Sequence, residues 1–379
     1  MKRSAWERLE SGRLWFDTKD VDWPEGPPSQ CTSLFLETNN RKTAASAFFD
    51  PTSRVPLRVY ARGRVAFDAS FLAAQLSSAV AYRKRILPSE DTGYRLVHAE
   101  ADSLPGLVVD RLGSHFSIQT SLANWRPWLG DIYATLAESM PVESSALETK
   151  EGRERIHGDP PAEVAYRMNG LKFLAPTQSG PKTGAFLDQR DNYLAAAGWA
   201  QRLGAQEYAL DLFTANGGFA RHLVPYVERV EAVDSSAAAI ELLKKSLEAT
   251  EKEKVRAVAG DVFEYLQARA KSRHRYSVIV VDPPAYAKSR SQRDNAVRKY
   301  ADLNRRAIGL AGSGALYVTC SCSHHIHATD LEDVVRSVAW EKGKTLQLLE
   351  RRGQSPDHPV LASHPESEYL KCLLYRVLY

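Results

Sequence analysis

The segment YALDLFTANGGF at residues 208–219 decides the fold class of this chain. Its first six residues are apolar except for one aspartate, which is typical of a strand buried on both faces of a sheet. The paired glycines Gly217 and Gly218 then permit a tight turn and let a ligand approach the backbone closely. A strand, a glycine turn and a helix in this order predict the first unit of a doubly wound α/β domain.

The alternation of strand and helix continues after this segment. Four further apolar segments follow, separated by helix-length stretches: RVEAVD at 229–234, VRAVAGD at 255–261, YSVIVVDPP at 276–284 and GALYVTCSC at 314–322. Such alternation is typical of a parallel sheet with helices on both faces. We therefore predict an α/β fold whose C-terminal part, residues 166–379, holds a Rossmann-like, doubly wound and mostly parallel sheet.

The residues before this region form two further composition regimes. Residues 1–68 contain short apolar runs broken by turn formers such as PEGPP at 24–28, which predicts a small β-rich domain. Residues 69–165 begin with an amphipathic helix at 71–86 and continue with strand-like segments, which predicts a small α+β domain.

Composition excludes several classes of protein. The chain has 379 residues, of which 44% are hydrophobic and 25% charged, as in globular proteins and unlike disordered or fibrous ones. No apolar run is long enough for a membrane span, and the start MKRSAWERLE lacks the apolar core of a signal peptide. Four dispersed cysteines do not form a disulfide framework, so we expect a cytoplasmic protein. The net charge of +4 permits nucleic-acid binding only if positive charge is clustered.

An acidic residue ends each of the first four predicted strands: Asp211, Asp234, Asp261 and Asp282. Ligands of open α/β sheets bind at the carboxyl ends of the strands. One such acid is more often a helix N-cap, but four in succession beside a glycine turn favour a nucleoside site. The turn lacks the GxGxxG pattern that cradles a pyrophosphate, which disfavours a dinucleotide. S-adenosylmethionine needs no phosphate cradle, whereas it does need acids for its ammonium and its ribose.

Five motifs together resemble those of a known family. They are GAFLDQRDNY at 184–193, DLFTANGGF at 211–219, DPPAYAKS at 282–289, TCSCS at 319–323, and DHPV at 357–360 with EYLK at 368–371. The set resembles the bacterial class I methyltransferases of large-subunit ribosomal RNA, of the cytosine-5 type. The resemblance covers essentially the whole chain. It implies S-adenosylmethionine as cofactor, large-subunit ribosomal RNA as partner, and a PUA-like RNA-binding domain at residues 1–68.

The resemblance also implies roles for individual residues. Asp211, Gly217 and Gly218 would line the cofactor turn, while Asp234 would hold the ribose and Asp261 the adenine. Asp282 would lie between the cofactor and the target base. The other residues expected at the cofactor site are Phe186, Gln189, Arg190, Phe213, Ser235 and Val262.

The TCSCS segment supplies the thiol that cytosine methylation requires. Carbon 5 of cytosine is a poor nucleophile, and addition of a thiolate at carbon 6 activates it. Cys320 and Cys322 would share one face if the strand continued, so spacing alone does not choose between them. The resemblance favours Cys322 as nucleophile, beside Asp282. Three nearby histidines do not complete a paired ligand set, so we expect no metal.

The family pattern is not fully matched. Many cytosine-5 RNA methyltransferases carry a second cysteine just after the Asp-Pro segment, and this chain has Ala285 there. The Asp-Pro-Pro box also resembles that of amino-group methyltransferases, with the aromatic Tyr286 displaced by one position. Methylation of an exocyclic amine on guanine or adenine therefore stays open, as does a non-catalytic RNA-binding protein on the same scaffold.

Positive charge gathers after the Asp-Pro-Pro box. Residues 288–306 hold seven basic and two acidic side chains, which suits contact with an RNA backbone but also a solvated helix face. The sequence does not determine the target nucleotide, and a homodimer is not excluded.

Overall fold

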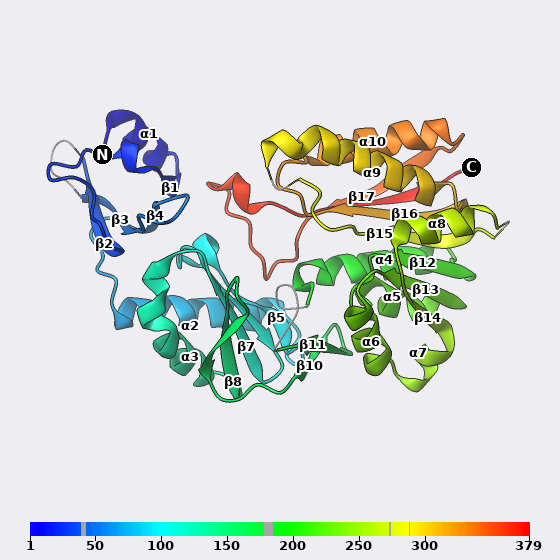
Figure 1. Cartoon of the computed structure of the whole chain (residues 1–379), viewed down its shortest axis with the longest axis horizontal. Helices are drawn as coiled ribbons and strands as arrows, with labels where there is room; N and C mark the ends of the chain where they lie inside the picture. Colours follow the sequence, from blue (N-terminus) through cyan, green and yellow to red (C-terminus); the bar gives the residue numbers. More distant parts are fainter. Residues whose placement is uncertain (39–42, 178–184, 273, 288) are drawn as a thin grey trace. The chain divides into compact units, whose positions relative to one another are not determined.

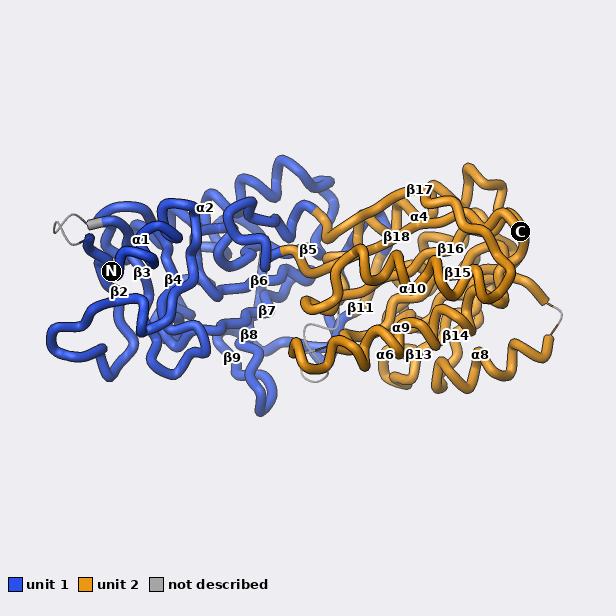
Figure 2. Tube along the Cα trace, turned by 90° about the horizontal axis from the view of Figure 1, so that it is seen from above, with its two compact units in different colours: residues 1–171, 175–183, 356–367 blue, residues 172–174, 184–355, 368–379 orange. Residues whose placement is uncertain are grey.

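The computed structural model describes residues 1–38, 43–177, 185–272, 274–287 and 289–379, which form two compact units (Figures 1 and 2). Unit 1 comprises residues 1–171, 175–183 and 356–367, and unit 2 comprises residues 172–174, 184–355 and 368–379. Two residues of the sequence motifs, Gly184 and Lys288, lie outside the described part of the chain.

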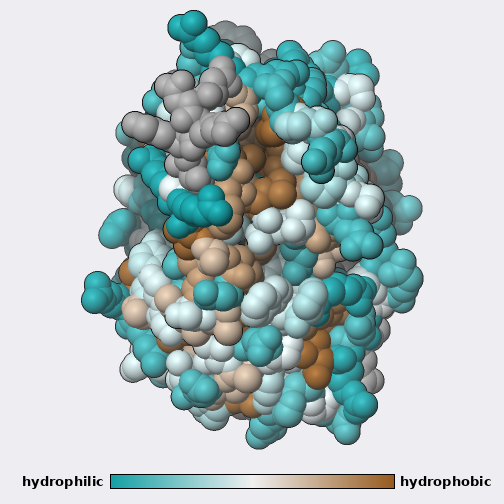
Figure 3. Space-filling view, turned by 90° about the vertical axis from the view of Figure 1, so that its left-hand side faces the viewer, coloured by the Kyte–Doolittle hydropathy of each residue, from teal (hydrophilic) through white to brown (hydrophobic). Residues whose placement is uncertain are grey.

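The N-terminal part of unit 1 is a four-stranded antiparallel sheet in the order β1-β4-β3-β2. Its elements are α1 (Arg3–Glu10), β1 (Trp15–Phe16), β2 (Thr32–Glu37), β3 (Thr43–Phe49) and β4 (Leu57–Arg62). Phe16, Phe49 and Leu57 are buried in its core. Hydrophilic side chains predominate on the face shown in Figure 3, and hydrophobic ones gather there in small patches.

The rest of unit 1 has a five-stranded sheet in the order β5-β6-β7-β8-β9, in which β7 and β8 are parallel and the other pairs antiparallel. Its elements are α2 (Ala69–Ile86), β5 (Gly93–His98), β6 (Leu107–Leu112), β7 (His115–Thr120), α3 (Leu129–Ala137), β8 (Ser144–Glu148) and β9 (Arg153–His157). Asp68 caps α2, since its carboxylate accepts a 2.8 Å hydrogen bond from the Phe71 amide. A hairpin of β10 (Glu163–Met168) and β11 (Leu171–Pro176) follows.

The described part of unit 2 holds a seven-stranded sheet in the order β14-β13-β12-β15-β16-β18-β17. Its strands are β12 (Tyr208–Leu212), β13 (Arg229–Asp234), β14 (Val255–Ala259), β15 (Tyr276–Val281), β16 (Ala311–Ser321), β17 (Leu346–Arg352) and β18 (Lys371–Val377). All neighbouring pairs are parallel except those that involve β18. The predicted Rossmann-like, mostly parallel sheet is thereby confirmed.

Helices cover both faces of this sheet (Figure 1). They are α4 (Arg190–Arg202), α5 (Gly218–Leu223), α6 (Ala237–Ser246), α7 (Ala249–Lys254), α8 (Val262–Ala270), α9 (Arg293–Ile308) and α10 (Ala328–Glu341). Helices α8, α9 and α10 share one apolar core with the sheet, and α4 and α5 lie on the other side. Because both faces are covered, residues 278–281 of β15 are completely buried. No helix in the described ranges is long and apolar enough to cross a membrane.

Candidate functional site

The four predicted acids follow four adjacent strands at one edge of the unit 2 sheet. Strand β12 lies between β13 and β15, and the register aligns Leu212 with Val233 on one side and with Val281 on the other. Asp211, Asp234 and Asp282 therefore lie at the ends of three neighbouring strands. Asp261 follows β14, which pairs with the far side of β13. This edge is where open α/β sheets bind their ligands.

Asp211 anchors the turn between β12 and α5. One carboxylate oxygen, Oδ2, accepts hydrogen bonds from the Thr214 hydroxyl at 2.5 Å and from the Ala220 amide at 2.9 Å. The other oxygen, Oδ1, is buried and has no hydrogen-bond partner among the described residues. Burial raises the pKa of Asp211 to about 7, and the charge of Asp234 adds to the rise. An unpartnered buried acceptor of this kind suits a cationic ligand group.

The turn itself has an unusual backbone. Phe213, Ala215 and Gly217 have φ angles of +63°, +49° and +87°, and for the two non-glycine residues this conformation is costly. The Ala215 amide donates a 2.9 Å hydrogen bond to Oδ2 of Asp234, which helps to hold the strained loop. A Cβ atom on Gly218 would lie 2.2 Å from Cζ of Tyr193, so a side chain there would force the ring to move. The turn thus presents bare backbone to the strand ends.

Asp234 and Asp261 differ in their surroundings. Asp234 is half-buried, and its second oxygen accepts a 2.8 Å hydrogen bond from the Ser236 amide. Asp261 is exposed and caps α8, because its carboxylate accepts hydrogen bonds from the amides of Phe263 at 2.8 Å and Glu264 at 3.0 Å. Asp261 is therefore a helix N-cap, which is the common role of a single acidic residue at a strand end. A capping carboxylate retains further lone pairs for a ligand.

Asp282 is linked to the segment that precedes β12. The Gln189 amide nitrogen donates a 3.0 Å hydrogen bond to Oδ2 of Asp282, and the Gln189 carbonyl accepts one of 2.6 Å from Asn192. Burial, followed by the charges of Asp188 and Asp211, raises the pKa of Asp282 to about 8. Asp282 therefore carries a proton near neutral pH, as a carboxylic acid that can donate a hydrogen bond.

The remaining residues predicted to bind the cofactor differ in their exposure to solvent. Phe186 is 43% exposed, and its carbonyl accepts a 3.1 Å hydrogen bond from the Tyr193 hydroxyl. Arg190 is buried at the start of α4, with Nε 3.9 Å from the Asp191 carboxylate. Ser235 is exposed after β13, whereas Val262 is the first residue of α8 and is buried in the core.

The two cysteines of the TCSCS segment have different environments. Strand β16 ends at Ser321, so Cys320 lies within the strand and Cys322 beyond it. Cys320 is completely buried opposite Cys372, and burial together with a hydrogen bond to Cys372 holds its pKa well above that of a free thiol. Cys322 is partly exposed. Because β16 ends at Ser321, the condition under which both thiols would share one face of the strand is not met.

Two polar side chains around Cys322 were not identified in the sequence. The Tyr300 hydroxyl of α9 accepts a 2.9 Å hydrogen bond from Ser321 and lies 3.2 Å from the Ser323 hydroxyl. The Lys371 ammonium donates hydrogen bonds to the carbonyls of Ser323 at 2.7 Å and Tyr369 at 2.9 Å. The sequence signal for Lys371 is its place in the EYLK motif, and Tyr300 has none beyond its position in the basic helix.

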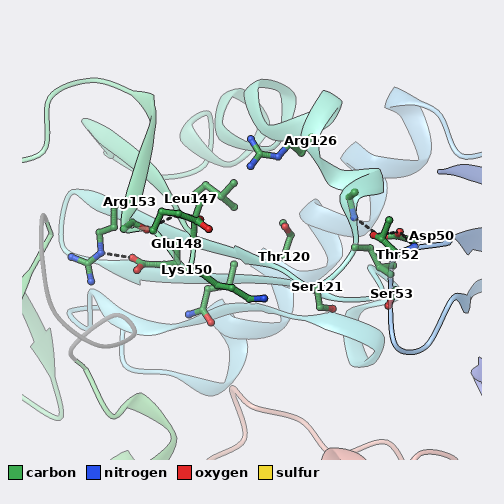
Figure 4. A pocket seen from close by; sticks show the side chains of 16 residues that line it. Asp50, Thr52, Ser53, Thr120, Ser121, Arg126, Leu147, Glu148, Lys150 and Arg153 are labelled. Atoms are coloured by element: carbon green, nitrogen blue, oxygen red, sulfur yellow. Dashed lines mark hydrogen bonds and ion pairs between the residues drawn. The ribbon is translucent and has the colours of Figure 1, made fainter. Parts of the chain in front are cut away.

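A second concave region lies in unit 1. A groove of about 830 Å³ in unit 1 is lined by the loop after β3 and by β7–β9 (Figure 4). Two of its charged groups are engaged locally: Arg153 pairs with Glu148 at 2.6 Å, and Asp50 accepts a 2.8 Å hydrogen bond from the Ala123 amide. No cluster of three or more potential metal ligands occurs in the part of the chain that the structure describes.

The strand-end site fits S-adenosylmethionine. Asp211 offers a buried acceptor for an ammonium group, Asp234 offers a carboxylate for ribose hydroxyls, and the glycine turn leaves room beside the backbone. Together with the strand order, these features define a Rossmann-like S-adenosylmethionine-dependent methyltransferase.

Comparison with solved structures supports this fold. A putative SAM-dependent methyltransferase from Streptococcus mutans matches with a TM-score of 0.83, at 17% identity over 99% of this chain and 98% of that chain. A putative methyltransferase complexed with SAH matches with a TM-score of 0.84, also at 17% identity, over 98% of both chains. At this level of identity the likeness concerns the fold. A family model described as Conserved hypothetical protein 95 matches residues 174–326.

Sequence comparison gives the family. Ribosomal RNA large subunit methyltransferase I of Citrobacter koseri is 31% identical over 96% of this chain and 95% of its own length. The enzymes of the same name from Klebsiella pneumoniae and Escherichia coli are 32% and 30% identical, with 96% of this chain aligned in both cases and 94% and 95% of theirs. The chain belongs to the ribosomal RNA large subunit methyltransferase I family.

Proposed function

We propose that this enzyme transfers a methyl group from S-adenosylmethionine to carbon 5 of a cytosine in large-subunit ribosomal RNA, with Cys322 as covalent nucleophile. The names of the full-length relatives support the RNA substrate. The observation that carries the covalent part is the contrast between the buried Cys320 and the partly exposed Cys322 at the end of β16. A thiol must reach the base to react, and only Cys322 of this pair is accessible.

The chemistry divides one difficult step into easier ones. S-adenosylmethionine supplies an electrophilic methyl group on a sulfonium. The Cys322 thiolate adds to carbon 6 of cytosine, so that the Sγ–C6 bond forms and the C5=C6 double bond opens. Carbon 5, now electron-rich, forms a bond to the methyl carbon, and the bond from that carbon to the sulfonium sulfur breaks. A base then removes the carbon-5 proton, the double bond reforms and Sγ leaves as thiolate.

Asp282 is suited to assist the addition step. Its carboxyl group is held by Gln189 and carries a proton near neutral pH, because burial raises its pKa to about 8. A neutral acid can donate a hydrogen bond to the base and stabilise the negative charge that builds up when the thiolate adds. Ala285 stands where many cytosine-5 RNA methyltransferases carry a second cysteine, so another group or water accepts the carbon-5 proton.

RNA contacts are proposed for both units. In unit 2, helix α9 exposes Arg298 and Lys299, and Arg290 is exposed just before it. In unit 1, we propose that residues 1–68 form a PUA-like RNA-binding domain and residues 69–165 a separate central domain. Phosphate contacts from such surfaces would position the RNA, while the target base leaves its stack to enter the site.

Amino-group methylation is the alternative within the same class. That chemistry uses an aromatic ring stacked on the target base, and Tyr286 is the nearest candidate. Its ring instead packs 5.0 Å from the Tyr300 ring, with the Lys299 ammonium 5.5 Å from its centroid. These contacts hold the Tyr286 ring against α9, which is the observation that favours the cytosine reaction.

Nucleoside analysis tests the proposal. Large-subunit ribosomal RNA from cells that lack this gene is incubated with the purified enzyme and labelled S-adenosylmethionine, digested, and analysed by mass spectrometry. The proposal predicts labelled 5-methylcytidine, which a Cys322→Ala variant does not form. Labelled N2-methylguanosine or N6-methyladenosine instead would establish the amino-group alternative.

A further inference from the structure

Lys371 is a buried lysine at the start of β18. It lies opposite Ser321, the last residue of β16, in the antiparallel pairing of the two strands. Only 7% of the residue is exposed, and its ammonium donates hydrogen bonds of 2.7 Å to the Ser323 carbonyl and 2.9 Å to the Tyr369 carbonyl. The ammonium is therefore fastened to the turn of residues 321–323, of which Cys322 is the middle residue.

The charge of this ammonium is not neutralised by a carboxylate in direct contact. Among the described residues, no acidic side chain forms an ion pair with Lys371 within 4.0 Å. Burial lowers the pKa of Lys371 to about 8, and three groups oppose that effect: first Cys322, then Glu368 and Asp330. The hydrogen bond to the Ser323 carbonyl places this ammonium at the residue that directly follows Cys322.

Two other polar side chains, those of Tyr300 and His324, lie near this turn. Tyr300 contacts Ser321 and Ser323, and burial raises its pKa to about 12, so its hydroxyl stays neutral. His324 follows Cys322 closely in the chain, and its ring centroid lies 5.7 Å from that of Tyr369. A buried ammonium beside a thiol favours the thiolate, because an opposite charge stabilises the ionised form.

We propose that Lys371 is a positioning residue whose ammonium fixes the turn that carries Cys322 and provides the positive charge beside which the Cys322 thiolate forms. This inference rests on the proposed function, in which the Cys322 thiolate adds to carbon 6 of cytosine. The thiol chemistry itself can be measured without RNA and without methyl transfer.

The test is the pH dependence of alkylation of Cys322. The full-length protein is treated with iodoacetamide between pH 5 and 10, and modification of Cys322 is quantified by tandem mass spectrometry, which distinguishes it from Cys320. We expect an apparent thiol pKa below the ordinary value of about 8.5. Lys371→Met should raise it by about one unit, which leaves roughly tenfold less thiolate at neutral pH. Lys371→Arg, which keeps the charge, should restore most of the shift.

Lys344→Met is the matched control. The Lys344 ammonium donates a 2.9 Å hydrogen bond to the Ala311 carbonyl at the other end of β16, far along the strand from Cys322. This variant should leave the alkylation profile unchanged. An unchanged profile in folded Lys371→Met would overturn the proposal. If that variant fails to fold, the wild-type profile decides, since an apparent pKa at or above 8.5 also overturns it. A low thiol pKa without any covalent RNA adduct would instead preserve the role of Lys371 and refute the proposed function.

Discussion

The Gln189 side chain donates a 3.0 Å hydrogen bond to Asp282 while Asn192 donates one of 2.6 Å to the Gln189 carbonyl. Asn192 thereby fixes the orientation of the amide, so that its nitrogen and not its oxygen faces Asp282. Asn192 is in turn held by the Gly353 carbonyl, which accepts a 3.1 Å hydrogen bond from it. This chain of contacts ties the start of α4 to the strand end that is proposed to meet the target base.

Gln189→Ala should slow methyl transfer and alter its pH dependence. The amide hydrogen bond favours the ionised form of Asp282, so its loss raises the pKa of Asp282 above about 8 and moves the alkaline limb of the rate profile to higher pH. Because Asp282 is neutral in its active form, the rate falls only through the lost positioning of its carboxyl group, and we expect a decrease of roughly twofold to tenfold at neutral pH, as for a hydrogen bond between neutral groups. Single-turnover rates measured from pH 6 to 10 check this. Gln201→Ala, which changes an exposed glutamine on α4, the helix that begins directly after Gln189, should behave as wild type.

Asp211→Asn and Asp282→Asn should each stabilise the free protein at pH 8. Burial raises the folded-state pKa of both acids, to about 7 and about 8, above the unfolded value of about 3.9. The folded state therefore binds an extra proton at each site, and that stabilisation is complete below pH 4 and lost as the pH rises through 7 to 8.

Thermal unfolding at pH 5 and pH 8 measures this effect. The melting temperature of each Asn variant should exceed that of wild type at pH 8, and the difference should shrink at pH 5, where the wild-type acids are protonated. Asp261→Asn is the control, because asparagine caps a helix as well as aspartate does. A melting temperature below wild type at pH 8 in both buried-site variants would contradict the assignment.

Much of the fold can be predicted from the sequence. The first five strands of unit 2 are mainly apolar runs, which can be recognised without knowledge of tertiary contacts. The same runs place Asp211, Asp234, Asp261 and Asp282 at strand ends, and the parallel register then brings them to one edge. Strands β17 and β18 are not predicted. Strand β17, LQLLERR, ends in three charged residues and lies at the edge of the sheet, where such side chains are tolerated.

The details of the thiol site depend on tertiary structure. Spacing places Cys320 and Cys322 on one face only if the strand continues, and the end of β16 at Ser321 is not visible in the residues themselves. Lys371 reaches the Ser323 carbonyl across 48 positions of sequence, through the antiparallel pairing of a strand that was not predicted. Residue patterns and the family resemblance therefore predict the site and favour Cys322, and the structure adds the difference in burial between the two thiols.

Asp211→Ala and Asp234→Ala should each weaken binding of S-adenosylmethionine. Asp211 contributes the unpartnered buried oxygen, and Asp234 holds the strained loop through Ala215. Loss of a charge-assisted hydrogen bond costs roughly 1.5–3 kcal/mol, or about tenfold to a hundredfold in affinity. Calorimetry without RNA measures this, with Asp333→Ala on α10 as an exposed control. Unchanged affinity in both variants would refute the assignment of S-adenosylmethionine to this site.

Positive charge on α9 should set the salt dependence of RNA binding. No ion pair is formed by Arg290, Arg298 or Lys299 within the described residues, whereas Arg293, Arg305 and Arg306 pair with acidic neighbours. Replacing the first three with Gln should reduce the slope of log affinity against log salt by about two, from the single-strand relation. Replacing the paired three should change the slope less. An unchanged slope after replacement of the first three would assign these charges to a solvated face.

The covalent role of Cys322 can be tested directly with RNA that contains 5-fluorocytosine at the target position. Fluorine cannot leave carbon 5 as a proton does, so the adduct is trapped after methyl transfer and survives denaturing electrophoresis. The wild-type enzyme and Cys320→Ala should both form the trapped complex with labelled RNA, and Cys322→Ala should form none. A complex that persists in Cys322→Ala but disappears in Cys320→Ala, or full methylation by the double variant, would contradict the account.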